Sequence, residues 1–160
     1  MATGKTAVGK ALAKKKKWQF IDLDDLIELR EKRTISDIFA KDGEPYFRRV
    51  EKRVLKEVVK EKKFVVACGG GIVLDEDNIR IMKEMGKIVC LSANPEVILK
   101  RTQGTCQRPL LNVENPKEKI KLLLKFRAPF YAQADYTIDT SKLSAEEVVA
   151  KILKQIKIGS

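Results

Sequence analysis

Two short apolar runs constrain the fold of this chain most strongly. FVVAC (64–68) ends in three consecutive glycines, and KIVCLSA (87–93) ends at Asn94-Pro95, where a helical stretch begins. An apolar run of this length is typical of a strand that is buried on both faces of a parallel sheet. We therefore expect both runs to be inner strands.

The other elements alternate in the same way. Further strands are expected at 18–24 and 135–140, and helical patterns cover 5–16, 25–32, 34–43, 44–62, about 75–85, 117–130 and 144–156. Ser144 with Glu147 forms a capping box at the last helix, whereas Asp24 or Asp25 is the expected cap of the helix at 25–32. Strands that alternate with helices predict parallel strands, right-handed crossovers and one α/β domain of three layers over residues 1–160.

Composition excludes several classes of function. The chain has no histidine, which rules out a Ser-His-Asp triad, a Cys-His dyad and a His-ligated zinc site. No apolar run approaches the roughly 20 residues that cross a bilayer, and the basic start lacks the apolar segment of a signal peptide. Cys68, Cys90 and Cys106 show no CxxC spacing, so reduced thiols and a cytoplasmic location are expected.

The net charge of +11 favours anionic partners. Much of the excess is lysine spread along helices, as in KALAKKKK, and such faces are usually only solvated. A nucleic-acid-binding protein stays open as an alternative. The chain shows no aromatic interleaving or known binding motif that would support it.

Several motifs point to phosphate chemistry. Gly4-Lys5-Thr6 opens a helix as the end of a phosphate-binding loop does, with the lysine on the phosphates and the hydroxyl on Mg²⁺. Asp22 and Asp24 alternate at the carboxyl end of a strand, where open α/β sheets bind ligands. Gly69-Gly70-Gly71 directly follows a strand, and such glycines suit a close approach of backbone to a ligand.

In their order along the chain these motifs resemble the shikimate kinases. The resemblance rests on GKT, D-x-D, FRR-x-E, GGG, RPLL and R-x-P-x-Y, and it runs from residue 2 to about 155. It implies a nucleoside-monophosphate-kinase-like P-loop fold with a substrate-binding insert at about 25–60 and a lid at about 102–116. It also implies a cytoplasmic monomer that transfers the γ-phosphate of ATP to the 3-hydroxyl of shikimate in aromatic amino-acid biosynthesis, with magnesium.

The resemblance implies a role for each matching residue. Lys5 binds the β- and γ-phosphates, Asp24 is the base, and Arg108 of the lid stabilises the transferring charge; these three are the implied catalytic residues. Arg101 lies against the adenine. The remaining implied contacts are Gly4 and Thr6 for ATP, Thr6 and Asp22 for Mg²⁺, and Asp24, Arg48, Gly69, Gly70, Gly71 and Arg127 for shikimate, whose carboxylate the two arginines hold.

One departure from the family pattern affects the expected fold. The phosphate loop of the family reads G-x-x-x-x-G-K-[ST] after a central strand, and the given sequence starts inside that loop, after its first glycine. We expect a sheet without its first strand, with unpaired neighbouring edges, lower stability and weaker ATP binding. Two alternatives stay open beside an active shikimate kinase. They are a kinase of another small molecule, such as gluconate, and a kinase-like domain that binds its ligand without turnover.

Overall fold

The computed structural model describes residues 2–58, 62–102 and 114–156, and its elements follow the expected order. In chain order they are α1 (Lys5–Lys16), β1 (Gln19–Asp22), α2 (Leu23–Glu31), α3 (Ile35–Val58), β2 (Phe64–Ala67), the 3₁₀ helix η1 (Ile72–Leu74), α4 (Glu76–Met85), β3 (Val89–Ser92), α5 (Pro95–Thr102), α6 (Pro116–Tyr131), β4 (Tyr136–Asp139) and α7 (Ala145–Gln155). Only η1 has no counterpart among the expected elements.

The four strands form two parallel pairs. β1 pairs with β2 in the register Gln19↔Phe64, and β3 pairs with β4 in the register Val89↔Tyr136. The expectation that FVVAC and KIVCLSA are inner strands is wrong within the described residues, because β2 and β3 each have a single partner strand. Both are half-buried along most of their length, since no described strand lies between them.

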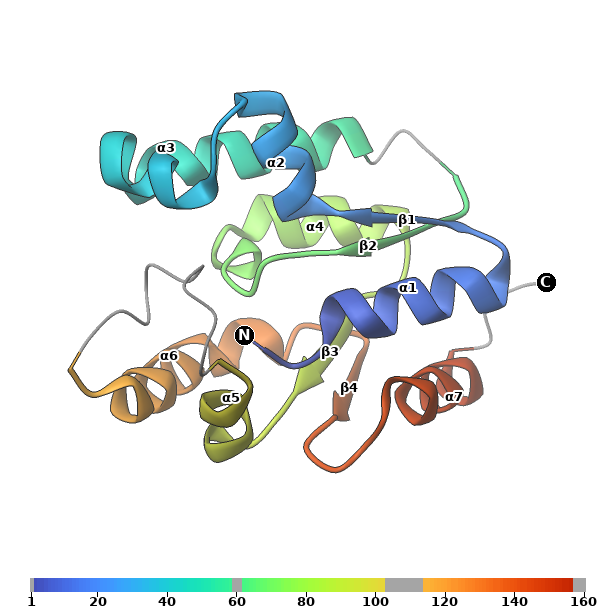
Figure 1. Ribbon diagram of the computed structural model, residues 1–160. Coiled ribbons are helices and arrows are strands. Elements are labelled where there is room, and N and C mark those ends of the chain that lie inside the picture. The colour runs from blue at the N-terminus through green and yellow to red at the C-terminus, as the bar shows by residue number, and fades with distance from the viewer. Residues whose placement is uncertain (1, 59–61, 103–113, 157–160) are drawn as a thin grey trace.

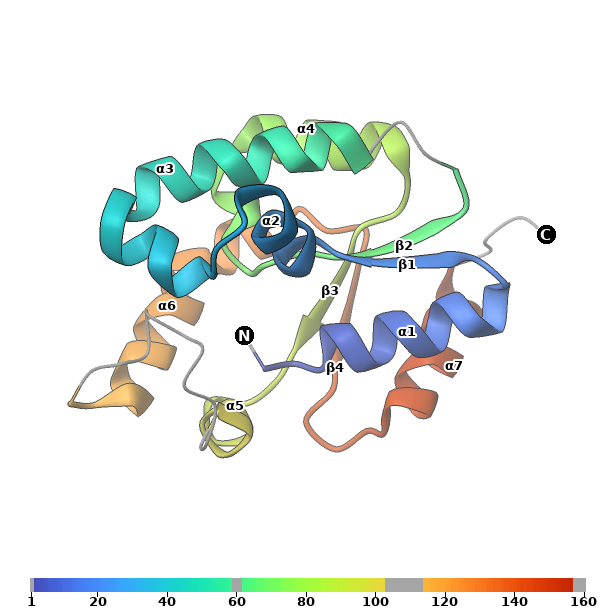
Figure 2. The ribbon, with the colours of Figure 1, turned by 45° about the horizontal axis from the view of Figure 1, so that its top comes forward.

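Helices cover the strands in two layers (Figures 1 and 2). One layer holds α2, α3 and α4, and the other holds α1 and α7. Side chains of β2 alternate between the two cores: Val66 packs against the α3 side with Leu23, Ile27 and Val54, whereas Val65 packs against the side of α1 and α7. The three-layer α/β arrangement is confirmed.

Local sequence explains the ends of several helices. Ser144 and Glu147 form the expected capping box at the start of α7. The cap of α2 is Asp22, whose side chain accepts a hydrogen bond from the backbone N–H of Asp24, so the expectation of Asp24 or Asp25 is wrong. The helix begins two residues earlier than expected because the aspartate that ends β1 also starts α2.

The helices expected at 34–43 and 44–62 are joined into α3 with a kink between them. Gly43 has φ 77° and ψ 174°, which is not helical, and Pro45 follows in the first turn of the second part. A glycine adopts this backbone conformation without a steric cost. After the kink, the second part of α3 packs on α2 and on the β1–β2 pair.

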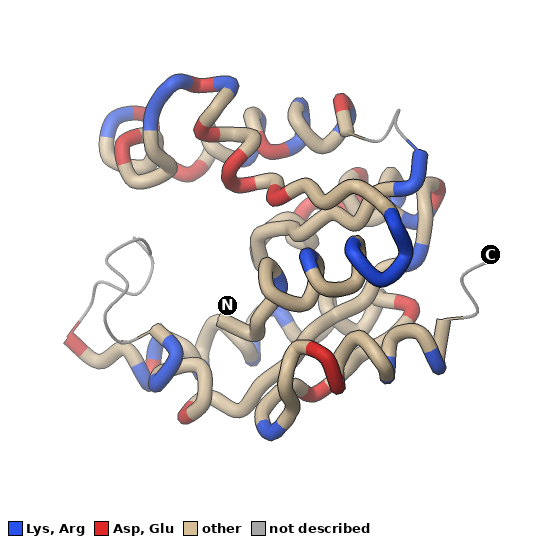
Figure 3. The backbone as a smooth tube through the Cα atoms, turned by 45° about the vertical axis from the view of Figure 1, so that its right-hand side comes forward, with Lys and Arg blue, Asp and Glu red and all other residues tan. Residues whose placement is uncertain are grey.

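Basic residues occur along most of the helices (Figure 3). Lys and Arg are spread over several helices, with a run at the C-terminal end of α1, where Lys14, Lys15 and Lys17 are exposed. This agrees with the expectation of solvated basic faces. Within the described ranges, no helix combines the length and apolar character that crossing a membrane requires.

Candidate phosphoryl-transfer site

The start of α1 has the geometry of an anion-binding site. Gly4 caps the helix with φ 89°, a left-handed conformation that favours glycine, and its carbonyl accepts the first helical hydrogen bond from Val8 N–H at 2.9 Å. The first N–H groups of a helix have no partner inside it and carry partial positive charge. The first turn of α1 contains no acidic residue to compete for them.

Thr6 and Asp22 meet beside this helix start. The Thr6 hydroxyl donates to the Asp22 carboxylate at 2.8 Å, although sixteen residues separate them in the chain. Figure 1 shows why: the first turn of α1 lies on the same side of the molecule as the carboxyl end of β1. One hydroxyl and one carboxylate oxygen fit the few protein ligands that Mg²⁺ takes beside waters and substrate phosphates.

The three glycines form a turn between β2 and η1 that other side chains contact closely. A Cβ atom on Gly69 would lie 3.4 Å from Asp24 Oδ1 and 3.4 Å from Glu51 Oε1. A Cβ atom on Gly71 would lie 2.7 Å from the Arg48 guanidinium carbon, which is shorter than any real contact of this kind. The turn therefore brings one aspartate, one glutamate and one arginine together from α2 and α3.

Arg48 is held by two carboxylates of its own helix. Its Nη1 donates to Glu51 Oε2 at 2.7 Å, and its Nη2 donates to Glu44 Oε1 at 2.9 Å. The Glu44 side chain is 44% exposed, whereas the Glu51 side chain is 0% exposed. These contacts fix the guanidinium against Gly71 while its face lies over the Phe47 ring at 5.1 Å.

Glu51 is a buried acid in this site. Its Oε1 atom has no hydrogen-bond partner among the described residues. Burial raises the pKa of Glu51 from 4.5 to about 7. Arg48 lowers this pKa, but the effect of burial is larger, and the negative charge of the nearby Asp24 adds to the rise. Glu51 is consequently protonated in a sizeable fraction of molecules near neutral pH.

Arg127 approaches the same place from α6. Its side chain is buried, and its Nε atom has no described hydrogen-bond partner. Arg127 also lowers the pKa of Glu51, which places the two groups within electrostatic reach of each other. One turn further along α6, the Tyr131 hydroxyl donates to the Gly70 carbonyl at 2.9 Å.

Cys68, which ends the FVVAC run, lies among these charged groups. The pKa of its thiol is raised to about 12, first by burial and then by the negative charges of Glu51 and Asp24. A thiol with such a pKa is protonated at neutral pH and is a poor nucleophile. This cysteine is free and is not a candidate for covalent catalysis.

Arg101, the residue expected at the adenine, has its described contacts outside this cluster. Arg101 donates to the Thr140 side chain at 3.2 Å, to the Thr140 carbonyl at 3.0 Å and to the Ala2 carbonyl at 3.3 Å. It thus ties the end of β4 to the chain just before Gly4. Arg108 lies outside the described residues.

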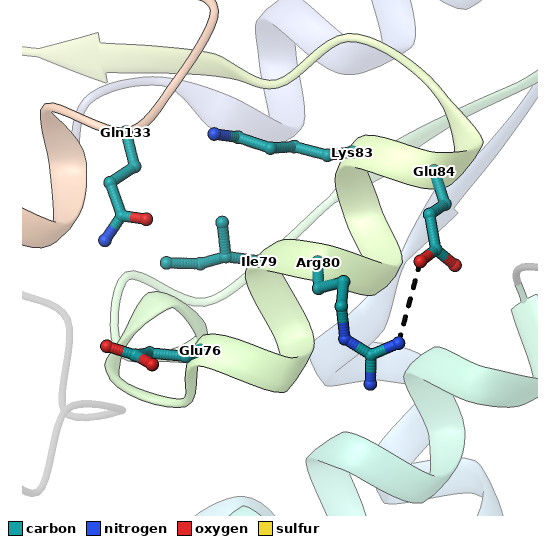
Figure 4. A pocket seen from close by; sticks show the side chains of 6 residues that line it. All are labelled: Glu76, Ile79, Arg80, Lys83, Glu84 and Gln133. Carbon is teal, nitrogen blue, oxygen red and sulfur yellow. Dashed lines mark ion pairs between the residues drawn. The ribbon is translucent and has the colours of Figure 1, made fainter.

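One hollow of the described surface lies away from these residues. A pocket of about 390 Å³ is lined by Glu76, Ile79, Arg80, Lys83, Glu84 and Gln133 (Figure 4). These side chains come from α4 and from the residues after α6, and none of them is an expected site residue. The open pocket has charged walls of both signs, with Arg80 paired to Glu84 at 3.6 Å.

The structure brings most of the expected site residues together and adds two that were not assigned roles. Glu51 and Tyr131 both belong to the quoted motifs FRR-x-E and R-x-P-x-Y. The signal that could have found them is helical spacing: Glu51 is three residues after Arg48, and Tyr131 is four residues after Arg127, so each pair shares a helix face.

Comparison with known proteins gives a consistent result. The family model described as shikimate kinase matches residues 1–157. The shikimate kinases of Thermoanaerobacter pseudethanolicus and Thermodesulfovibrio yellowstonii are 49% and 48% identical, over 96% and 97% of this chain and 90% of each relative. The solved structure of shikimate kinase from Acinetobacter baumannii in complex with shikimate has a TM-score of 0.95 and 42% identity, covering 98% of this chain and 88% of that one.

Proposed function

The chain belongs to the shikimate kinase family, and on that premise we propose which of its residues carry the reaction. Its activity is that of an ATP-dependent transferase that uses ATP and shikimate. The observation that carries the assignment of residues is the convergence at the Gly69–Gly71 turn, where Asp24 lies next to Gly69 and Arg48 next to Gly71. Asp22 links this turn to the start of α1, because it contacts both Thr6 and the backbone of Asp24.

The start of α1 binds the phosphates of ATP in this proposal. The left-handed Gly4 and the N–H groups at the start of the helix suit phosphate oxygens. Lys5 adds a full positive charge for the β- and γ-phosphates, and Arg101 is the proposed contact for the adenine. The Arg101 bonds to Thr140 and Ala2 support a position beside the phosphate site.

Magnesium is the proposed cofactor, held by Thr6 and by Asp22 through water. The donor set supports this assignment, because both groups offer oxygen and meet at 2.8 Å. Bound there, the ion would neutralise charge on the phosphates of ATP. Thr6 and Asp22 orient one another, and Asp22 also holds the first turn of α2, so that the position of Asp24 is linked to the metal site.

Shikimate is proposed to bind at the glycine turn. Arg48 and Arg127 bind its carboxylate, because guanidinium groups match a carboxylate with two parallel hydrogen bonds. The buried Nε of Arg127 has no described partner, and this supports its role as a donor to a ligand. Gly69, Gly70 and Gly71 let the backbone come close to the sugar-like ring.

Asp24 is the proposed base for the attacking hydroxyl. Phosphoryl transfer needs mainly the positioning of two substrates and positive charge around the moving group. Lys5 supplies one such charge, and the lid arginine Arg108 is proposed to supply another. Asp24 accepts the proton of the shikimate 3-hydroxyl as the oxygen of that hydroxyl bonds to the γ-phosphorus, while the bond from the γ-phosphorus to the bridging oxygen breaks and ADP leaves.

The proposal also covers the state of the protein in the cell. The chain is proposed to be a single domain that acts as a cytoplasmic monomer, without nucleic acid or membrane as a partner. The reduced state of Cys68 and Cys90 supports a reducing compartment. Gel filtration at two protein concentrations tests the monomer.

The test is release of ADP from MgATP with and without shikimate. Wild-type protein is expected to turn over only with shikimate, and Asp24→Asn is expected to lower kcat by about 100-fold or more, as loss of a general base does. Asp25→Asn removes the same charge from the exposed neighbouring residue and serves as the control with normal turnover. Turnover with gluconate instead of shikimate, or shikimate binding without turnover, would support one of the alternatives.

A further inference from the structure

Tyr131 joins the end of α6 to the glycine turn. Its hydroxyl donates to the Gly70 carbonyl at 2.9 Å across 61 residues of chain. The turn itself is closed by backbone bonds from Ile72 N–H to the Gly69 carbonyl at 3.2 Å and from Leu74 N–H to the Gly71 carbonyl at 3.1 Å. The carbonyl of Gly70, between these two, is therefore held by a side chain from another element.

A turn of three glycines needs such an anchor more than an ordinary turn does. Glycine has the widest range of backbone conformations, so each of the three loses the most entropy when the turn is ordered. Arg48 presses on Gly71 and the acids Asp24 and Glu51 lie next to Gly69. For Gly70, the middle glycine, the described side-chain contact is the hydrogen bond from Tyr131.

Tyr131 is suited to this task at neutral pH. Burial raises the pKa of its hydroxyl above the ordinary value, although Arg127 acts in the opposite direction, so the group keeps its proton and can donate it. Arg127, one turn earlier on α6, also interacts with the Tyr131 hydroxyl. The same helix face thus carries both a residue that anchors the turn and an arginine of the proposed substrate site.

We propose that Tyr131 is a positioning residue for shikimate, because its hydroxyl fixes the glycine turn relative to Arg127. This inference rests on the proposed function. A turn that is free to shift would change the distance between the backbone of Gly70 and the guanidinium groups that hold the substrate carboxylate. The ATP side, built on the start of α1, has no part in this contact.

Tyr131→Phe tests the proposal because it removes the hydroxyl and keeps the ring. We expect KM for shikimate to rise about 5- to 10-fold, the effect of one hydrogen bond, with KM for ATP unchanged and kcat changed less than twofold. Amide hydrogen exchange at residues 69–72 is expected to become faster in this variant.

Tyr46→Phe is the matched control. The Tyr46 hydroxyl donates to Glu31 at 2.7 Å, and its ring packs against Arg33 and Arg49, on a different side of α3 from Gly71. This variant loses one hydroxyl hydrogen bond of a half-buried tyrosine, as Tyr131→Phe does, so we expect a similar fall in unfolding free energy. Unlike Tyr131→Phe, it should keep a normal KM for shikimate and normal amide exchange at residues 69–72.

The outcomes separate this proposal from the function on which it rests. A wild-type protein that turns over shikimate, with equal kinetics in the two variants, would show that Tyr131 is only a structural anchor and would overturn the proposal. A wild-type protein that neither turns over nor binds shikimate, measured by calorimetry, would refute the proposed function first and this inference with it.

Discussion

The free energy of unfolding should fall as the pH rises towards neutrality, because Glu51 titrates differently in the folded and unfolded protein. Its pKa is about 7 in the folded protein against an ordinary value of 4.5. Between these values the folded state keeps a proton that the unfolded chain has released, so the free energy of unfolding decreases with pH. Each pKa unit corresponds to about 1.4 kcal/mol, which gives a loss of about 3 kcal/mol between pH 4.5 and pH 8.

Burial and the charges around Glu51 act together on its pKa, and burial decides the direction of the shift. Arg48 at 2.7 Å and the more distant Arg127 favour the ionised carboxylate. Burial and the negative charge of Asp24 disfavour it. A carboxylate with 0% exposure and one oxygen without a described partner loses most of its hydration, and this cost is the larger effect.

The assay compares wild-type protein with Glu51→Gln by urea unfolding, followed through the single tryptophan, at intervals from pH 4.5 to pH 8. The glutamine is isosteric, can still accept a hydrogen bond from Arg48 and does not titrate in this range. Other carboxyl groups are the same in both proteins, so their contributions cancel in the difference. The difference in unfolding free energy, wild type minus variant, should fall by about 3 kcal/mol across this range.

A difference curve that is flat, or that rises with pH, would refute the reasoning. It would mean that the ion pair with Arg48 compensates the lost hydration in full. The structure would then contain an ordinary ionised glutamate, and the interpretation of Glu51 as a titrating group near neutral pH would have to be abandoned.

Two glycine substitutions give further predictions. Gly71→Ala should raise KM for shikimate at least about 10-fold, because the added Cβ displaces the end of Arg48. It should lower the unfolding free energy by less than about 2 kcal/mol, since the end of Arg48 is flexible. Kinetics and urea unfolding measure the two effects. Gly9→Ala should cost about 1–2 kcal/mol of unfolding free energy, because its Cβ would lie 2.5 Å from the Phe20 ring. Gly86→Ala, with no atom within 4 Å of its Cβ, is the control and should be close to neutral.

Hydrophobic periodicity predicted the order of the elements because each one has a strong local signal. The capping box at Ser144 and the apolar run at 64–68 needed no knowledge of the rest of the chain. Strand pairing is different, since it depends on which strands lie next to each other. The run at 64–68 is apolar in every position and so predicted burial on both faces, yet β2 pairs only with β1 in the described residues.

The motifs predicted which residues belong to the site but not how they hold one another. Arg48 and Glu51 share a helix face, and so do Glu44 and Arg48, so spacing alone cannot say which carboxylate is buried. The answer depends on the glycine turn, which covers Glu51 and leaves Glu44 towards solvent. Likewise nothing in the local sequence of Tyr131 identifies a partner 61 residues away.

The raised pKa of Glu51 connects the stability of the site to its proposed substrate. An ionised Glu51 would orient Arg48 but would also cancel its charge, and a second negative charge would repel the carboxylate of shikimate. A protonated Glu51 still accepts a hydrogen bond from Arg48 through Oε2, so the guanidinium stays in place, and only one of the two carboxyl groups that contact it loses its negative charge. The net charge of +11 counts Glu51 as ionised, and only the buried position of this side chain shows that the proton can remain on it.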